Sequence, residues 1–157
     1  MKKLLPLFAI LAAGSAVAQI PDDAVNLSAE GTANCYIVTP GTTAYFDATR
    51  KGNSLTETTG EIAGAKLVWQ TDKSLVSRLE FDAATGSICA WTSGSAGNAL
   101  VAVTDAKDKI LWSWHLWITE YDPANDYTPE PNAAGTTWTF MDRNLGALTS
   151  DVTNPRS

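Results

Sequence analysis

The only histidine of the chain, His115, has the side chain best suited to acid–base chemistry or metal binding. It lies in an aromatic stretch, between Trp114 and Trp117. No serine, cysteine or carboxylate stands at a motif spacing that would make it the partner of a nucleophile. The sequence around Ser95 is no nucleophile elbow, because the glycine two positions earlier is missing. We therefore expect His115 to be hydrogen-bonded within a sheet, and we predict no catalytic residue.

The two cysteines, Cys35 and Cys89, each lie in a run of residues typical of a strand. In an exported protein they could form one disulfide. As two separate buried thiols they would behave as small hydrophobic residues instead. We favour the thiols, because nothing in the sequence places the two runs side by side. One histidine and two distant cysteines are too few ligands for zinc, so we predict neither a metal nor a cofactor.

Acidic residues near the end of the strand-rich region offer oxygen atoms of the kind that calcium binds. Asp105 and Asp108 form one group, and Asp122, Asn125 and Asp126 form another. Neither group has the spacing of a calcium-binding loop. Solvated turns are the better interpretation, because Asp and Asn side chains stabilise turns.

Aromatic residues offer a different kind of site, since flat apolar rings with a polar edge suit the faces of sugars. The candidates for a glycan platform are Trp91, Trp117, Tyr121 and Trp138, with Tyr127 as a further ring in the same region. The alternative is that Trp91 and Trp117 lie in the core or under a cover of the sheet. A carbohydrate-binding module is thus one of two functions to weigh.

The elements that must position these residues are strands. In residues 110–119, one alternating face is wholly apolar and the other, which carries His115 and Trp117, is mixed. Such a strand suits the middle of a sheet, with one face in the core and the other partly covered. No segment of useful length has helical periodicity. The other predicted strands are residues 24–29, 34–38, 43–48, 65–70, 75–81, 87–91 and 99–103.

Turn residues between these strands predict how they pair. Pro40 and Gly41 predict a hairpin between the second and third strands. Residues 105–109 predict another, in which the Trp-rich strand returns antiparallel to residues 99–103. Closely spaced strands with Gly and Pro turns favour an all-β fold, an antiparallel immunoglobulin-like β-sandwich. We expect Leu67 and Trp69 to point inward.

The immunoglobulin-like prediction concerns architecture only. Cys35, Trp69 and Cys89 occur in the order that an immunoglobulin domain shows. Their spacing does not fit, because the tryptophan comes too late and the second cysteine follows it too soon.

The chain divides into four predicted parts. Residues 1–18 have a basic start, an apolar run and an A-x-A site, the pattern of a secretory signal peptide. The run is too short to anchor in a membrane, and no later stretch could span one. Residues 19–120 are the β-sandwich domain, and residues 121–135 are a Pro-rich linker. Residues 136–157 begin an incomplete second domain, or dock as a strand on the sandwich edge, followed by a disordered tail.

Composition excludes some partners. The formal net charge is −6, and loss of Lys2 and Lys3 with the signal peptide makes the mature chain more acidic. This argues against nucleic acid or an anionic membrane surface, since both require clustered basic residues. The signal peptide predicts export to the periplasm, the outer surface or the extracellular space.

Five blocks are similar to sequences in one group of known proteins: GTANCYIV at residues 31–38, LVWQ at 67–70, GNALVAV at 97–103, LWSWHLW at 111–117 and MDRNLGA at 141–147. Through these blocks the chain resembles exported surface proteins of the Bacteroidota type, including fimbrillin-like ones. The final block resembles the start of a Fibrobacter-type major paralogous domain. The resemblance implies a surface or adhesion-associated protein and supplies no catalytic residue.

We therefore expect a non-enzymatic, exported structural module of a cell-surface or adhesion protein, which presents or spaces a C-terminal part. Its expected partners are other surface proteins or glycans. The alternative is a carbohydrate-binding module that uses exposed aromatic residues.

Overall fold

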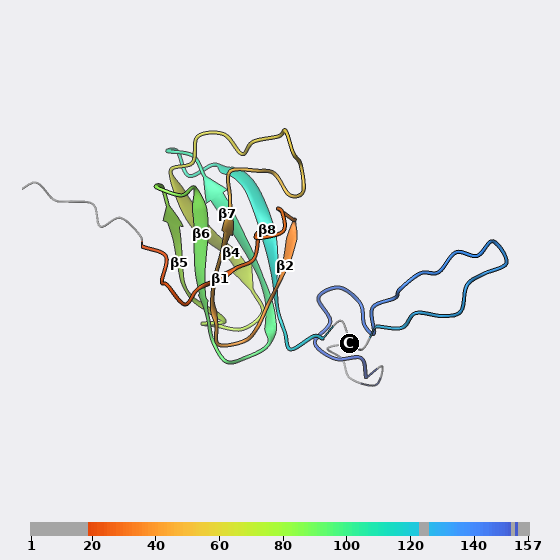
Figure 1. Ribbon diagram of the computed structural model, residues 1–157. Helices are drawn as coiled ribbons and strands as arrows, with labels where there is room; N and C mark the ends of the chain where they lie inside the picture. The colour runs from red at the N-terminus through yellow and green to blue at the C-terminus, as the bar shows by residue number, and fades with distance from the viewer. Residues whose placement is uncertain (1–18, 123–125, 152, 154–157) are drawn as a thin grey trace, which may run out of the picture.

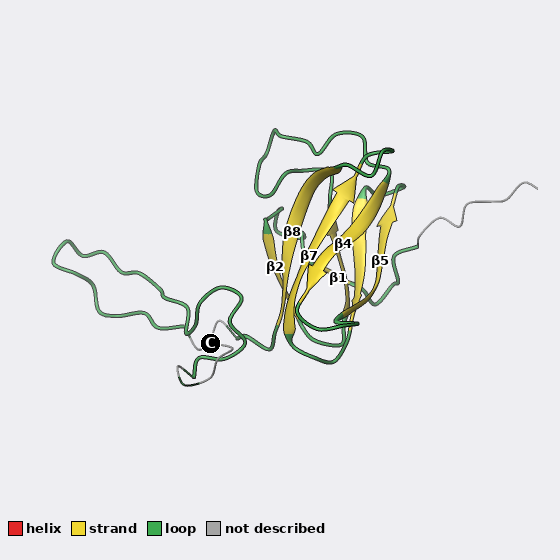
Figure 2. Cartoon of the chain, turned by 180° about the vertical axis from the view of Figure 1, so that it is seen from behind, coloured by secondary structure: helices red, strands yellow, loops and turns green. Residues whose placement is uncertain are grey.

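The computed structural model describes residues 19–122, 126–151 and 153. The predicted signal peptide lies outside the described residues, as do parts of the predicted linker and tail. The described part forms strands and loops without a helix, as Figure 2 shows, so it contains no helix fit to cross a membrane. The strands are β1 (Val25–Asn26), β2 (Cys35–Val38), β3 (Thr43–Asp47), β4 (Gly64–Gln70), β5 (Val76–Asp82), β6 (Ser87–Thr92), β7 (Gly97–Thr104) and β8 (Ile110–Ile118).

The strands form two sheets of four, which face each other across one core (Figure 1). The β6 sheet has the order β1-β3-β6-β5, and the β8 sheet has the order β2-β8-β7-β4. The predicted β-sandwich is therefore confirmed. The sheets are mixed, however, because β1 runs parallel to β3 and β2 runs parallel to β8. The antiparallel prediction is wrong at these two edges and holds for the other four pairs.

The predicted hairpin at Pro40 and Gly41 is also wrong. Strand β2 belongs to the β8 sheet and β3 to the β6 sheet, so this turn crosses from one layer to the other. The Gly41 N–H donates to the Ser93 carbonyl at 2.7 Å, which ties the crossing to the end of β6. Two short strands bury every second side chain whether the turn between them forms a hairpin within one sheet or crosses to the other sheet. Periodicity therefore cannot distinguish them.

The predicted hairpin of β7 and β8 is confirmed. Its strands pair antiparallel from Gly97 opposite Ile118 to Thr104 opposite Ile110. The Asp105 carboxylate closes the turn by accepting from the N–H groups of Lys107 and Lys109, at 2.8 and 3.0 Å. This hairpin makes β8 a central strand with β2 on its other side.

The core lies between the inner faces of the sheets, and rings from both layers meet in it. The Phe46 ring centroid is 4.7 Å from that of Tyr36 and 5.3 Å from that of Trp114. The apolar face of β8 is fully buried only in its second half, since Ile110 is exposed and Trp112 is partly buried. The buried cluster comprises Tyr36, Val38, Ala44, Phe46, Ala48, Leu75, Val76, Ile88, Ala90, Ala99, Val101, Val103, Trp114, Leu116 and Ile118.

Trp69 does not point inward, and a β-bulge explains why. Leu67 pairs with Val101, a core residue, but the register shifts before Trp69, which pairs with Leu100. A bulge inserts one residue and so reverses the alternation after it. Trp69 therefore lies on the outer face of the β8 sheet and is 52% exposed.

Beyond β8 the chain forms two parts, which we name the protruding loop (residues 127–140) and the docked segment (residues 142–148). Tyr127 and Phe140 close the protruding loop through two backbone hydrogen bonds of 2.8 Å. The loop extends away from the sandwich, as the blue trace in Figure 1 shows. Residues 136–157 were predicted to begin a second domain or to dock as a strand, and their described part adds no strand to either sheet.

Candidate functional site

The structure brings His115 together with two residues that are distant in sequence. Cys35 lies opposite His115 in the parallel pairing of β2 with β8, and its Sγ is 3.2 Å from His115 Nδ1. Asn98, on β7, places its Oδ1 2.8 Å from His115 Nε2. These side chains lie on the outer face of the β8 sheet, because their neighbours Tyr36, Leu116 and Ala99 belong to the core. The prediction that His115 is hydrogen-bonded within a sheet is confirmed.

A hydrogen bond that the docked segment accepts determines which ring nitrogen of His115 carries the proton. The carbonyl of Gly146 accepts from Asn98 Nδ2 at 2.9 Å. A carbonyl can only accept, so the NH₂ group of Asn98 faces Gly146 and its Oδ1 faces His115. Because Oδ1 is also an acceptor, His115 Nε2 carries the proton of the neutral imidazole. Nδ1 then carries no proton, and its lone pair accepts a hydrogen bond from the Cys35 thiol.

Burial favours the neutral forms of both Cys35 and His115. It raises the pKa of the Cys35 thiol and lowers the pKa of the His115 imidazole. The resting group is therefore a thiol hydrogen-bonded to an imidazole, and not a thiolate–imidazolium ion pair. A proton would move from sulfur to nitrogen only as the sulfur attacks another atom.

Cys89 has a different environment. It lies on β6 in the other sheet, it is fully buried, and both cysteines are free. Burial and, secondarily, the charge of Glu80 raise its pKa to about 11. The two thiols thus differ in their access to solvent and in the presence of a base.

Cysteine, histidine and asparagine are the residue types of a nucleophile, its base and the amide that orients the base. Sequence analysis missed this group, since Cys35 and His115 are 80 positions apart. Only the parallel pairing of β2 with β8 brings them together. The only signal available was that His115 falls on the mixed side of an alternating strand; Cys35 shares its side of β2 with Ile37 and gives no such signal.

The docked segment covers the outer face next to His115. Trp117 follows on that face and is nevertheless fully buried. Its Nε1 donates to the Ala147 carbonyl at 3.1 Å, and its ring stacks on Tyr121 with centroids 5.2 Å apart. The docked segment thus gives the outer face a small buried layer of its own.

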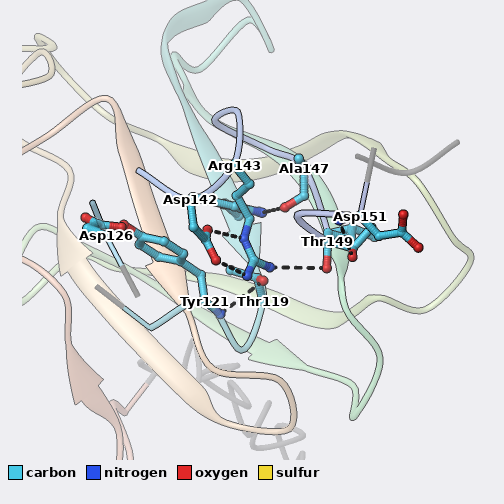
Figure 3. Close-up of polar contacts among 10 residues, drawn as sticks. Thr119, Tyr121, Asp126, Asp142, Arg143, Ala147, Thr149 and Asp151 are labelled. Carbon is cyan, nitrogen blue, oxygen red and sulfur yellow. Dashed lines mark hydrogen bonds and ion pairs between the residues drawn. The ribbon is translucent and has the colours of Figure 1, made fainter. Parts of the chain in front are cut away.

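Arginine and tyrosine side chains brace the docked segment (Figure 3). Arg143 binds both carboxylate oxygens of Asp142, at 2.6 and 2.8 Å, and its guanidinium lies 5.5 Å from the centroid of the Tyr121 ring. This pairing lowers the pKa of Asp142. The Tyr121 hydroxyl donates to Asp126, which raises the pKa of Tyr121 to about 12. These contacts hold both ends of the protruding loop near the end of β8.

The four aromatic residues predicted as a glycan platform do not share a surface. Trp117 and Tyr121 are buried against each other, so neither offers a free ring face. Trp91 lies on β6, in the opposite layer, and the Arg78 guanidinium sits 4.4 Å from its ring centroid. Trp138 lies in the protruding loop and is exposed. Of the four, Trp138 alone presents a largely uncovered ring.

Two hollows border the docked segment, and Leu148 lines both of them. The smaller, of about 230 Å³, lies beside Asn98 and is also lined by Thr71 and Asp72. The larger, of about 350 Å³, is lined by Pro40, Gly94, Ala96, Thr119, Glu120, Arg143 and Leu148. The smaller hollow thus shares Asn98 with the group around His115.

Comparison with known proteins found no matching protein-family model, curated protein or solved structure. Among the described residues, no group of three or more His, Cys, Asp or Glu side chains is arranged to hold a metal ion. What the site can do therefore has to follow from its own geometry.

Proposed function

We propose that the chain is a non-enzymatic, exported structural module whose β-sandwich presents its C-terminal part, at a cell surface or in an adhesion assembly. The observation that carries this proposal is that both ends of the protruding loop are fastened near the end of β8, through contacts of Trp117, Tyr121 and Asn98 that we name the clamp. The chain enters the loop past Tyr121, and on return the docked segment fastens to Trp117 and Asn98. The loop is thus held at both ends on a rigid sheet.

The side chains of the protruding loop suit contact with a partner. Tyr127, Trp138 and Phe140 are 66%, 63% and 55% exposed. Burying an aromatic side chain of this size gains about 1.5–3 kcal/mol, so a partner that covered these rings would bind through them. The predicted signal peptide and the resemblance to Bacteroidota surface proteins support the same function and the exported location.

Loop removal tests this proposal. Because Tyr127 and Phe140 are paired, a short Gly-Ser link can replace residues 128–139 without moving the clamp. We expect the variant to melt like the wild type and to be exported, but to lose association with other surface components in crosslinked cell-envelope fractions. The variant Leu55→Ser, which removes an exposed apolar side chain elsewhere on the surface, is the matched control and should keep this association. Unchanged association without the loop, or native protein found only in the cytoplasm, would overturn the proposal.

A carbohydrate-binding module is the second candidate, and the exposed ring of Trp138 favours it. A glycan array separates the two functions. The variant Trp138→Ala should lose glycan binding, whereas Trp69→Ala, an exposed tryptophan on β4, should keep it. Absence of binding to any glycan, or equal binding by both variants, rules this candidate out.

A further inference from the structure

We infer that Cys35 is a nucleophilic thiol, with His115 as its general base, and that it forms a mixed disulfide with low-molecular-weight disulfides. This would give the structural module a covalent attachment site on its outer face, separate from the protruding loop. It does not depend on the function proposed above.

The geometry supplies the nucleophile and the base in contact. His115 Nδ1 lies 3.2 Å from Cys35 Sγ, within reach for a proton transfer from a thiol. Asn98 and, through it, the Gly146 carbonyl keep the proton on Nε2, so that the lone pair of Nδ1 stays directed at the sulfur. Asn98 is therefore a positioning residue. The docked segment completes the arrangement.

The exchange balances without an outside oxidant. Cys35 Sγ attacks one sulfur of the incoming disulfide while its proton passes to His115 Nδ1. The new S–S bond forms as the old one breaks, and the leaving thiolate takes the proton from the imidazolium. One disulfide replaces another, so the protein and the small molecule together gain and lose no electrons.

The surroundings favour a disulfide over an acyl substrate. Attack on sulfur needs a nucleophile, a base and access, and Cys35 has access because β2 is an edge strand and the thiol is only partly buried. Acyl transfer also needs N–H donors aimed at a developing oxyanion. The backbone N–H of His115 is already used, since it donates to the Asn34 carbonyl at 2.9 Å.

No charged side chain is among the residues that the structure places against this pair. The uncharged neighbours of the pair are Asn98 and Leu100 on β7, Ser113 and Trp117 on β8, Ile37 on β2, and Gly146 in the docked segment. Asp142 and Arg143, the charged residues of the docked segment, pair with each other. The pH dependence of the reaction should therefore report His115 and Cys35 alone.

The test measures the rate of reaction with dithiodipyridine against pH. In a Cys89→Ala background, which leaves Cys35 as the single thiol, the rate should be level between the pKa of His115 and that of Cys35. With His115→Gln the level region should disappear, and the rate should rise about tenfold per pH unit because only free thiolate reacts. At about pH 7 we expect this variant to react about 100-fold more slowly.

Two variants of Asn98 give an independent test. Asn98→Ala should lower the rate in the level region, because either imidazole nitrogen can then carry the proton and only the form with a bare Nδ1 acts as the base. Asn98→Asp loses the donor to the Gly146 carbonyl but keeps an acceptor at Nε2, so it should restore the rate of the level region, and its negative charge should move the start of that region to higher pH. Mass spectrometry should find the adduct on Cys35. The inference fails if His115→Gln leaves the pH profile unchanged, or if Cys35 reacts no faster than Cys89 does in a Cys35→Ala chain.

Discussion

Replacing Trp117 by phenylalanine should loosen the docked segment while the sandwich stays folded. The Trp117 indole N–H donates to the Ala147 carbonyl at 3.1 Å, in a contact that is fully buried on the Trp117 side. Phenylalanine cannot donate, so the carbonyl would lose this partner, at a cost of about 1–3 kcal/mol. The stack on Tyr121 is kept in part, since phenylalanine retains an aromatic face.

The expected loss therefore falls on the docking equilibrium. A loss of about 2 kcal/mol corresponds to a factor of about 30 in that equilibrium. Hydrogen exchange followed by mass spectrometry or NMR measures it as faster amide exchange in residues 142–148. Amides of β7 and β8 at the centre of the sheet should exchange as in the wild type.

Trp112→Phe is the matched control, because it makes the same chemical change on the same strand. The Trp112 indole donates to Asn34 Oδ1 at 3.1 Å, away from the docked segment. This variant should leave exchange in residues 142–148 unchanged. Equal exchange in the wild type and Trp117→Phe, or equal acceleration by both substitutions, would refute the reasoning.

Three further predictions concern the site and the core. Gly146→Ala should release the docked segment, since Gly146 has φ +87° and a Cβ there would lie 3.2 Å from Asn98 Oδ1. Gly135→Ala has similar strain at φ +75° but no atom within 4 Å, so hydrogen exchange should show release in the first variant only. Burial lowers the pKa of His115 below its unfolded value near 6.5, so the stability due to the neutral imidazole is complete above that pH and is lost as pH falls towards the folded-state pKa. The free energy of unfolding in urea should fall between about pH 8 and pH 5 in the wild type by an amount that is missing in His115→Gln. The same pH dependence in both proteins would contradict this prediction. Phe46→Ala should cost about 3–5 kcal/mol in urea unfolding, because this ring packs between both sheets, and a loss below about 1 kcal/mol would contradict that packing.

The sequence predicted the strands well, because alternation and turn residues are local signals. The β7–β8 hairpin carries both signals and was correct in position and direction. The choice of partner for β2 and β3 is a long-range matter, and Pro40 and Gly41 serve a crossing as well as a hairpin. The prediction that Trp69 points inward is wrong for a local reason. One bulge reverses the alternation of side chains, and it leaves no trace in the pattern of residue types.

The site was less predictable than the fold. The mixed outer face of β8 correctly indicated a partial cover, but nothing local showed that residues 142–148 provide it. Residues 136–157 were expected to begin a second domain or to dock as a strand, yet their large apolar side chains Trp138, Phe140 and Leu145 are exposed, and the smaller Ala147 makes the buried contact. Cys35 joined His115 only through a parallel pairing of strands far apart in sequence.

The protonation of the His115 imidazole is the most direct test of the whole arrangement, because it depends on Gly146, Asn98 and Cys35 together. Nitrogen-15 NMR of the side chain distinguishes a protonated ring nitrogen from a bare one. Near neutral pH we predict a single neutral tautomer, with the proton on Nε2 and a bare Nδ1 that accepts from the Cys35 thiol. A proton on Nδ1, or a mixture of both tautomers, would contradict it.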